Sequence, residues 1–326
     1  MRVVGEIHCW HWRGRPVCAY AGGSVRDRLA ALSLFPRTSL KRRCLYGMMQ
    51  LTVRLGLDRV MARMIDAPDA LLSAEECRGL VERIGKLYGG EMVEWLITWP
   101  AMATRRRLYL VYRIPARSIL GVAKIGAGTF NQRQLENEAA MLERLAGESH
   151  PFAVPSVRMQ ASWTSERTVL VLDGLPAAHR ACSGWEAREA ANMICAHLQS
   201  LDVPKRRVML CEVAWGREVS GLPEAFDACF AHGDLGPGNM ALMPDGRVLL
   251  YDWENASCEA PMETERVGFW LACNQRAVLR EPQERYVDMV QEFSDVPEAD
   301  IRFALAFLAA HDNLAASRML RGIVNR

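Results

Sequence analysis

Short apolar runs separated by turn residues dominate the middle of the chain and predict β-strands. The runs are rich in β-branched, aliphatic and aromatic residues, which is typical of strands. They cover residues 92–98, 108–114, 119–125 and 168–175, the last of them ending in a turn.

Two further apolar runs flank a Pro-Asp-Gly turn signal at 244–246 and predict a β-hairpin. Reflecting the hairpin about the Asp-Gly bond places Asn239 opposite Asp252. Two oxygen ligands then lie side by side at the open end of the hairpin. Mg²⁺ binds few protein ligands, usually one or two carboxylates together with phosphate oxygens. The pattern therefore predicts a magnesium site at Asn239 and Asp252.

A helical periodicity follows the third strand-like run. One apolar stripe recurs at about 100° per residue and consists of Leu135, Ala139, Leu142 and Leu145. Glu138 falls inside this stripe, whereas Glu136 and Glu143 point away from it. A carboxylate on a buried face needs a charged partner. We therefore expect Glu138 to pair with Lys124, which lies near the end of the preceding run.

The C-terminal third has helical patterns at 185–201, 262–274, 283–293 and 298–320. Pro297 is expected to open the last of these helices, with Asp295 as its cap.

Composition narrows the class of protein. The chain has 326 residues, half of them apolar, with a net charge of +2 and a pI near 8.1. These values exclude a disordered chain and argue against nucleic acid as the main partner. Ten cysteines without a Cys-x-x-Cys pair suit a reducing compartment, so we expect a cytoplasmic protein.

Two segments carry the strongest chemical signal. Residues 231–239 read Ala-His-Gly-Asp-Leu-Gly-Pro-Gly-Asn, and residues 249–254 read Leu-Leu-Tyr-Asp-Trp-Glu. They resemble the catalytic loop and the metal-binding Asp motif of protein kinases. Glycine in place of the usual arginine, and Asp-Trp-Glu in place of Asp-Phe-Gly, are similar to the aminoglycoside phosphotransferase and choline kinase-like family. Members of that family phosphorylate small molecules.

The resemblance implies a bilobal protein-kinase-like fold of the α+β class. Its small lobe is an antiparallel sheet with one helix, and its larger lobe is mainly helical. The implied divisions are an N-terminal extension, helical in part and without an assigned role, a small nucleotide-binding lobe, and a large catalytic and acceptor-binding lobe. They cover residues 1–90, 91–175 and 176–326.

The resemblance also assigns roles to residues. Asp234 orients or deprotonates the acceptor hydroxyl, and Asn239 and Asp252 hold Mg²⁺. Lys124 binds the phosphates of ATP or GTP, and Glu138 fixes this lysine. Further nucleotide contacts come from a hinge that includes Asp173 and Leu175, where adenine meets backbone groups.

The sequence departs from the family pattern at two places. The loop at 99–107, between the first two strands, contains no glycine, although the kinase loop over the phosphates is glycine-rich. Thr264 stands where relatives usually have an aspartate that braces the catalytic loop. Glu263 or Glu265 could take over this bracing role.

The reaction implied is transfer of the γ-phosphoryl group to a hydroxyl of a small molecule. Aminoglycosides, amino alcohols, sugars and glycan- or lipid-linked precursors are all acceptors that fit. An acidic pocket would favour polyamines, and four glutamates are candidates for it: Glu254, Glu259, Glu263 and Glu265. The alternative function is a nucleotide-binding pseudokinase that acts as a scaffold or regulator.

The segment 37–65 is basic and contains many Leu and Met residues. This pattern favours a helix packed on the small lobe. The alternative is an amphipathic helix that contacts the inner face of a membrane peripherally. Every other predicted motif lies C-terminal to this segment.

Overall fold

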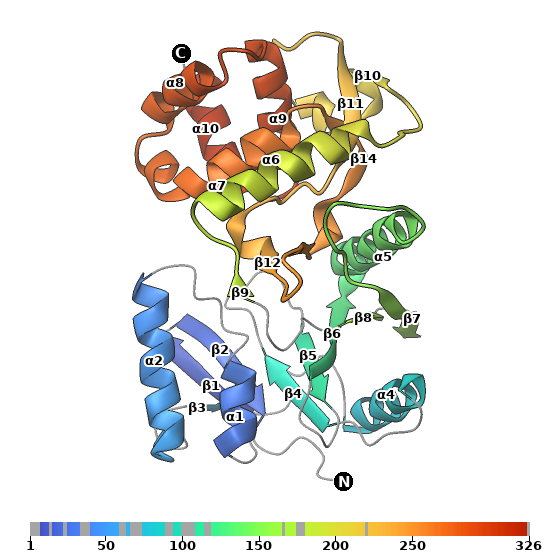
Figure 1. The fold of residues 1–326 in the computed structure, drawn as a ribbon, viewed down its shortest axis with the longest axis vertical. Helices are drawn as coiled ribbons and strands as arrows, with labels where there is room; N and C mark the ends of the chain where they lie inside the picture. The colour runs from blue at the N-terminus through green and yellow to red at the C-terminus, as the bar shows by residue number, and fades with distance from the viewer. Residues whose placement is uncertain are drawn as a thin grey trace. The chain divides into compact units, whose positions relative to one another are not determined.

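The computed structural model divides the chain into two compact units (Figure 1). Unit 1 contains residues 1–139 and 155–177, and unit 2 contains residues 140–154 and 178–326. The structure describes residues 7–12, 15–21, 25–32, 40–58, 63–65, 74–88, 94–98, 108–113, 119–164, 167–173, 180–218 and 221–324.

The main element of unit 1 is a five-stranded antiparallel sheet in the order β4-β5-β6-β8-β7. The strands are β4 (Glu94–Thr98), β5 (Leu108–Arg113), β6 (Ile119–Ala127), β7 (Val157–Thr164) and β8 (Arg167–Asp173). The four apolar runs expected to form strands correspond to β4, β5, β6 and β8. Residues 168–172 of β8 are all buried, which explains why this strand reads as a continuous apolar run.

The N-terminal part of unit 1 forms a second, three-stranded sheet in the order β2-β1-β3. Its elements are β1 (Ile7–Trp12), β2 (Arg15–Ala21), α1 (Val25–Leu32), α2 (Leu40–Arg54), β3 (Arg63–Ile65) and α4 (Ala74–Leu87). Both β2 and α1 contact β4, and α2 contacts α1. Residues 1–90 therefore share a unit with the larger sheet, and their separate role stays a prediction.

Helix α5 (Gly128–Leu145) follows β6 directly. The expected apolar stripe is buried at each of its four positions. Glu138 is buried with the stripe, whereas Glu136 and Glu143 are exposed. The helical-face argument is thus confirmed for all three glutamates.

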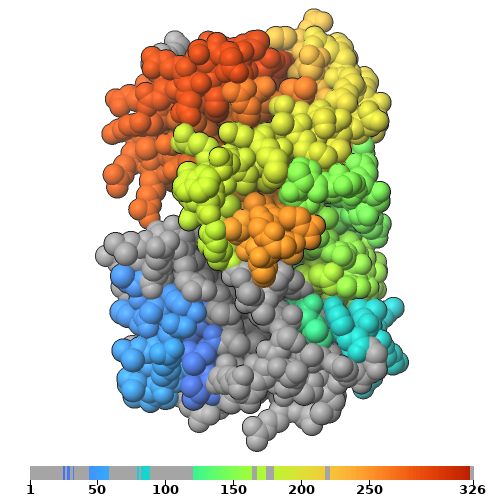
Figure 2. All heavy atoms as spheres, in the orientation of Figure 1, coloured from blue at the N-terminus to red at the C-terminus, as the bar shows by residue number. Residues whose placement is uncertain are grey.

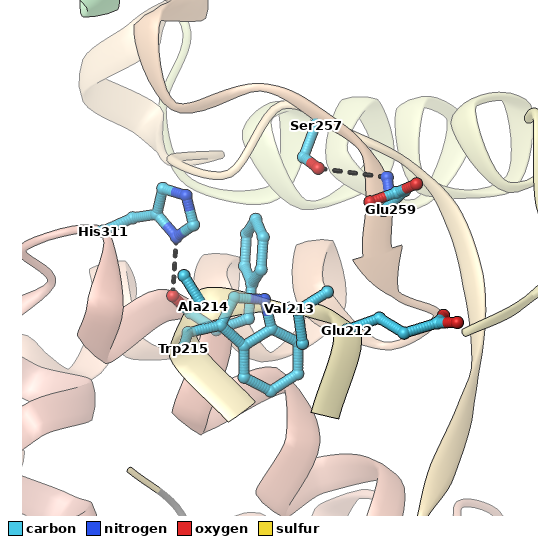
Figure 3. A pocket seen from close by; sticks show the side chains of 8 residues that line it. Glu212, Val213, Ala214, Trp215, Ser257, Glu259 and His311 are labelled. Atoms are coloured by element: carbon cyan, nitrogen blue, oxygen red, sulfur yellow. Dashed lines mark hydrogen bonds between the residues drawn. The ribbon is translucent and has the colours of Figure 1, made fainter. Parts of the chain in front are cut away.

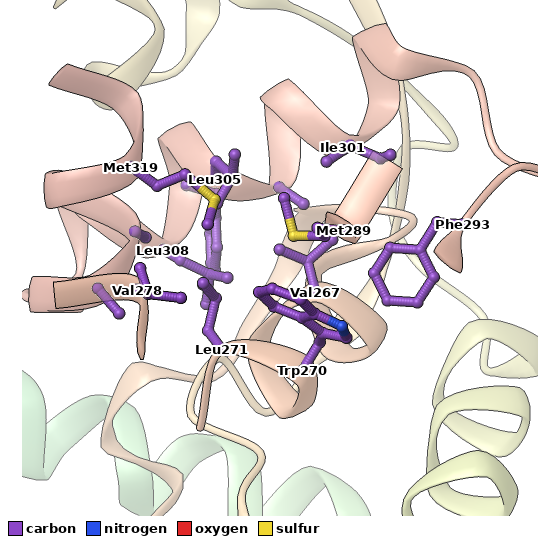
Figure 4. Packing of buried hydrophobic residues seen from close by; sticks show 14 of the residues in the cluster. Val267, Trp270, Leu271, Val278, Met289, Phe293, Ile301, Leu305, Leu308 and Met319 are labelled. Carbon is purple, nitrogen blue, oxygen red and sulfur yellow. The ribbon is translucent and has the colours of Figure 1, made fainter. Parts of the chain in front are cut away.

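Unit 2 is mainly helical. Its helices are α6 (Trp185–Ser200), α7 (Thr264–Arg280), α8 (Pro282–Glu292), α9 (Glu298–Ala310) and α10 (Leu314–Val324). The last four enclose one apolar core, in which Leu271, Leu305 and Met319 are fully buried (Figure 4). Among the described residues, no helix is both long and apolar enough to cross a bilayer.

The expectation of one helix over 298–320 is wrong, because the chain turns at His311–Asn313 between α9 and α10. Asp312 has a φ of 64°, a left-handed conformation that ends a helix. Asn313 then caps α10, since its side-chain oxygen accepts the Ala316 N–H at 3.0 Å. Two polar residues that favour turns and caps outweighed the apolar periodicity.

The expected cap of α9 is also wrong. Pro297 occupies the N-cap position and makes no side-chain hydrogen bond there. The Asp295 carboxylate instead pairs with Arg266, 3.3 Å away.

Two small sheets complete unit 2, in the orders β10-β11-β14 and β13-β12-β9. Their strands are β9 (Arg180–Ala181), β10 (Arg207–Met209), β11 (Ala225–Ala231), β12 (Met240–Leu242), β13 (Val248–Leu250) and β14 (Ser257–Pro261). The sheet in unit 1 and the helices of unit 2 confirm the expected α+β class.

The β12–β13 hairpin is present, but its predicted register is wrong by one residue. Met240 pairs with Leu250, so Asn239 lies opposite Tyr251 and not opposite Asp252. The hairpin loop has three residues, with Met243 N–H bonded to Arg247 O at 2.8 Å. Its last residue, Gly246, has a φ of 85°, the left-handed position typical of a three-residue hairpin loop. The reflection point is therefore the middle residue of the loop, not the Asp-Gly bond.

Candidate active site

The chemical motifs lie inside one strand of unit 1 and at the ends of short strands in unit 2. In unit 1, β6 carries Lys124 and α5 follows it. In unit 2, β11 leads into the segment His232–Asn239, the β12–β13 hairpin follows, and the Asp-Trp-Glu segment comes next. This is the order of elements that the sequence motifs imply.

His232 ties the catalytic loop to the segment after the hairpin. Its side chain is fully buried. Nε2 lies 3.0 Å from the carbonyl oxygen of Tyr251, and Nδ1 accepts the Asp234 N–H at 3.2 Å. Because a carbonyl can only accept, the ring proton belongs on Nε2. The imidazole also meets the buried Trp253 ring edge-on, with centroids 4.6 Å apart.

Gly233 must be a glycine for two reasons. Its φ is 78°, and a Cβ there would lie 2.2 Å from the carbonyl oxygen of Asn255. The arginine of the protein-kinase loop therefore has no room at this position. The Gly233 N–H donates to Oε1 of Glu265 at 2.8 Å, which fixes the loop from the other side.

Glu265 is the residue that braces the catalytic loop. It lies in the first turn of α7 and is buried. Glu263, the other candidate, pairs with Arg266 at 3.1 Å. The bracing contact is therefore made by the residue that follows Thr264, and a glutamate makes it in place of the usual aspartate.

The Glu265 carboxyl ionises less readily than that of an exposed glutamate. Burial raises the pKa of this carboxyl to about 7, although N–H groups of Gly233 and His232 oppose the shift. The nearby Asp234 carboxylate raises the pKa further. Oε2 of Glu265 has no hydrogen-bond partner among the described residues. The brace therefore titrates close to neutral pH.

Asp234 is exposed, as a group that meets a substrate must be. The Asn239 side-chain nitrogen donates to Oδ2 of Asp234 at 2.9 Å and to its backbone carbonyl at 2.8 Å. This double contact fixes the carboxylate without neutralising it. Since the amide nitrogen of Asn239 is used here, its amide oxygen is the atom that remains suited to a cation.

Asp252 has the strained backbone of this region. Its φ of 73° and ψ of 55° are left-handed, a conformation that is costly for residues other than glycine and least so for Asp and Asn. The neighbours on both sides are fixed. The Tyr251 N–H bonds to Asn239 O at 3.1 Å, and Trp253 Nε1 bonds to Leu250 O at 2.9 Å. This tight frame sets the direction of the Asp252 side chain.

The donor set of this region fits Mg²⁺. Asp252 and Glu254 have carboxylate oxygens within 4.8 Å of each other, and Glu254 is buried. Two like charges this close favour a cation between them or beside them. Hard oxygen donors such as these and the Asn239 amide are the ligands Mg²⁺ prefers. From the sequence, Glu254 was predicted only as a residue of the acceptor pocket. Its place two residues after Asp252 is the signal that would have indicated a position beside the proposed metal site.

The polar centre of unit 1 is a buried ion pair. Lys124 Nζ lies 2.8 Å from both carboxylate oxygens of Glu138. Lys124 is 5% exposed and Glu138 is fully buried. The pairing predicted from the helical face is therefore present, while the binding of phosphates by Lys124 stays a prediction.

Of the two hinge residues predicted to contact the nucleotide, the structure describes Asp173 but not Leu175. Asp173 ends β8, where its N–H donates to Ser156 O at 3.1 Å and its carboxylate pairs with Arg158 at 2.5 Å. A contact between Asp173 and adenine stays a prediction. Leu175 and the glycine-free loop 99–107 lie outside the described residues.

Unit 2 also contains a pocket of about 240 Å³. Its lining is aromatic and polar and consists of Glu212, Val213, Ala214, Trp215, Ser257, Glu259, Phe307 and His311. In the view of Figure 3, both glutamates lie on one side of the Trp215 ring and His311 on the other. Ser257 pairs with Ala231, so the pocket borders the strand that leads into the catalytic loop. Of the four glutamates considered for an acceptor pocket, only Glu259 lines this one.

Most polar groups of the pocket accept hydrogen bonds. His311 Nδ1 donates to Phe307 O at 2.8 Å, so the lone pair of the neutral ring is on Nε2. Burial lowers the pKa of His311, which favours this neutral form. The two glutamates are acceptors when ionised, and the Lys205 ammonium lowers the pKa of Glu212 through a direct hydrogen bond. The lining therefore suits a ligand that is rich in donors or positively charged.

Solved structures similar to this chain include aminoglycoside phosphotransferase APH(4)-Ia, with a TM-score of 0.45, 12% identity, and coverage of 76% of this chain and 97% of that chain. The GDP and kanamycin complex of APH(2″)-IIia has a TM-score of 0.44, 12% identity and the same coverage. WbdD, crystallised with a kinase inhibitor, has a TM-score of 0.31, 17% identity, and coverage of 63% and 43%. No protein-family model matches the sequence, and no curated protein is significantly similar to it.

Proposed function

We propose that this protein is a phosphotransferase that moves the γ-phosphoryl group of ATP or GTP to a hydroxyl of a small molecule. One observation carries the proposal. Asp234 is exposed on a loop that three different contacts fix: His232 to Tyr251 O, Gly233 to Glu265, and Asn239 to Asp234 itself. A fixed carboxylate in solvent is suited to orient or deprotonate a hydroxyl.

The protein's own groups would act mainly by positioning and by charge. The acceptor oxygen forms a bond to the γ-phosphorus while the bond to the β–γ bridging oxygen breaks, and the hydroxyl proton passes toward Asp234. Lys124, held by Glu138, would bind phosphate oxygens. Asn239 and Asp252 would hold Mg²⁺, which when bound offsets the negative charge of the phosphates. Little covalent chemistry is required of the protein in such a transfer.

The pocket beside β14 supports a donor-rich acceptor. An amine would find the Trp215 ring and the Glu259 carboxylate, a combination that attracts cations. The Ser257 hydroxyl, which accepts the Glu259 N–H at 3.0 Å, keeps its own proton for a substrate oxygen. Amino sugars and amino alcohols are therefore the acceptors we would test first, followed by neutral sugars and lipid-linked precursors.

The alternative of a nucleotide-binding pseudokinase rested on the glycine-free loop and on Thr264 at the bracing position. The contact between Glu265 and Gly233 fills the bracing role, which favours the enzyme over the scaffold. Cytoplasmic location stays a proposal that rests on cysteine usage.

The test is nucleoside diphosphate release from ATP and GTP with a panel of these acceptors, alongside nucleotide binding by calorimetry. We expect turnover with at least one acceptor. Asp234→Asn should lower this turnover by about 10²- to 10⁴-fold while leaving nucleotide binding and the melting temperature unchanged. Asp245→Asn, an exposed aspartate on the hairpin turn, is the matched control and should behave as wild type. Nucleotide binding without turnover for any acceptor would support the pseudokinase.

A further inference from the structure

Helix α2 has two apolar faces on opposite sides. Tyr46, Met49 and Val53 form the inner face and are buried. Met48, Leu51 and Leu55 form the outer face and are 53%, 58% and 62% exposed. At 100° per residue the two sets lie roughly half a turn apart. The buried inner face accounts for the helix packing expected of residues 37–65. The exposed outer face is not explained by that packing.

The outer face continues beyond the end of the helix. Gly56 ends α2 in a left-handed conformation, with φ 70°, and its N–H bonds to Val53 O at 3.1 Å. The Leu57 N–H bonds to Thr52 O at 3.0 Å, which completes a Schellman motif. This turn leaves Leu57 49% exposed next to Leu55. We call Met48, Leu51, Leu55 and Leu57 the outer stripe. The blue atoms of α2 lie at the surface in Figure 2.

The segment that carries the outer stripe is strongly basic. Residues 37–65 contain seven Lys and Arg residues and one acidic residue, a net charge of +6, although the whole chain has only +2. The single acid, Asp58, is fully buried and pairs with Arg28 at 3.0 Å. Arg54, within one turn of Leu51 and Leu55, is exposed. An apolar stripe in a basic segment matches a surface with negative charge outside and hydrocarbon beneath.

We propose that the outer stripe of α2 binds the surface of a membrane that contains anionic lipids, as a peripheral contact. The charge decides between this occupant and a second copy of the chain. Two copies meeting through the stripe would bring together segments of +6 each, and their repulsion opposes a dimer. Anionic headgroups instead attract the basic residues, while the four apolar side chains enter the interface. The proposal does not depend on phosphotransfer.

The test is flotation of the full chain with vesicles of phosphatidylcholine containing phosphatidylglycerol. Vesicles of phosphatidylcholine alone are the lipid control. We expect binding to the anionic vesicles at about 0.05 M salt and a loss on the order of tenfold at ~0.5 M, because ions screen the attraction. The triple variant M48Q/L51Q/L55Q should bind on the order of tenfold more weakly at low salt. Arg54→Gln should reduce binding less and should weaken its salt dependence.

A matched control removes three exposed apolar residues from unit 2, in the variant M209Q/V287Q/L314Q. It should bind vesicles as wild type does. Both triple variants should keep the wild-type melting temperature, since each changes exposed side chains. The proposal fails if the α2 triple variant binds like wild type, or if wild type does not bind anionic vesicles at low salt. It also fails if sedimentation shows a dimer that the α2 triple variant abolishes.

Discussion

The polar centre of unit 1 and that of unit 2 are stabilised in opposite ways. In unit 1, Lys124 and Glu138 neutralise each other directly and are both buried. In unit 2, the Asp234 carboxylate is exposed, and its position comes from the Asn239 amide and from the His232 imidazole, which accepts the Asp234 N–H. A buried ion pair of this kind is a structural contact as well as a chemical one, because removing one partner leaves a charge without compensation. The exposed carboxylate can be changed with little effect on folding.

The largest expected effect is that of Asp252→Ala. The variant removes one of the two residues proposed for Mg²⁺ and should abolish turnover with magnesium nucleotide. Its stability should fall slightly, because alanine tolerates the left-handed backbone at φ 73° less well than aspartate does. Steady-state turnover and a melting curve measure the two quantities. Turnover within tenfold of wild type would contradict the metal assignment.

The second largest effect is a loss of stability, which is expected for Glu138→Gln. The Lys124 ammonium would lose the carboxylate that it pairs with inside unit 1, and breaking a buried pair costs about 3–5 kcal/mol of the free energy of unfolding. Urea unfolding followed by circular dichroism measures this value. The double variant K124M/E138L should recover most of the stability while remaining inactive. A single variant as stable as wild type would show that the ion pair contributes nothing to unit 1.

A pH-dependent effect is expected from Glu265→Gln, which keeps an oxygen for the Gly233 N–H but cannot ionise. The pKa of Glu265 is raised from 4.5 to about 7 in the folded protein, mainly by burial. An acid with a raised pKa binds its proton more tightly when folded, so its contribution to stability is present below 4.5 and is lost as the pH rises through about 7.

Relative to E265Q, wild type should therefore lose roughly 3 kcal/mol between pH 4.5 and pH 8. The measurement is the free energy of unfolding of both proteins across this range. The pH profile of turnover should also lose an inflection near neutrality in E265Q. If the free energies of unfolding of the two proteins changed in parallel with pH, Glu265 would not be a buried group that titrates in this range.

The smallest effect is expected for Glu136→Ala, on the exposed side of the helix that carries Glu138. Surface substitutions of this kind stay within about 0.5 kcal/mol, and turnover should be unchanged. Equal losses for E136A and E138Q would undermine the distinction between the two faces of α5.

These two regions also differ in how far sequence could predict them. The ion pair between Lys124 and Glu138 followed from the 100° periodicity of α5, because one buried face decided between three glutamates. The predicted hairpin register was wrong by one residue, because a Pro-Asp-Gly loop can close with two or with three residues, and the bond from Met243 N–H to Arg247 O shows that it closes with three. Residues distant in sequence were harder still. The resemblance narrowed the brace of the catalytic loop to Glu263 or Glu265, but nothing local to Glu265 indicates that it is the one that reaches Gly233, thirty-two positions earlier.

The prediction of a single helix over 298–320 failed for another local reason. Apolar periodicity runs through 298–320 without a break in its hydrophobic pattern. The Asp312 turn and the Asn313 cap, two polar residues in sequence, ended one helix and began the next. Capping signals inside a periodic segment thus carry more weight than the period itself.

The close approach of Gly233 to Asn255 has a consequence for the tolerance of the catalytic loop to random mutation. A library covering Gly233 and Gly238 would treat two glycines of one short loop very differently. A side chain at Gly233 meets a backbone oxygen at 2.2 Å, whereas a Cβ at Gly238 meets nothing within 4 Å. Every substitution at the first position should be depleted regardless of size, while alanine should survive at the second. The loop therefore carries its own internal standard for mutational scanning.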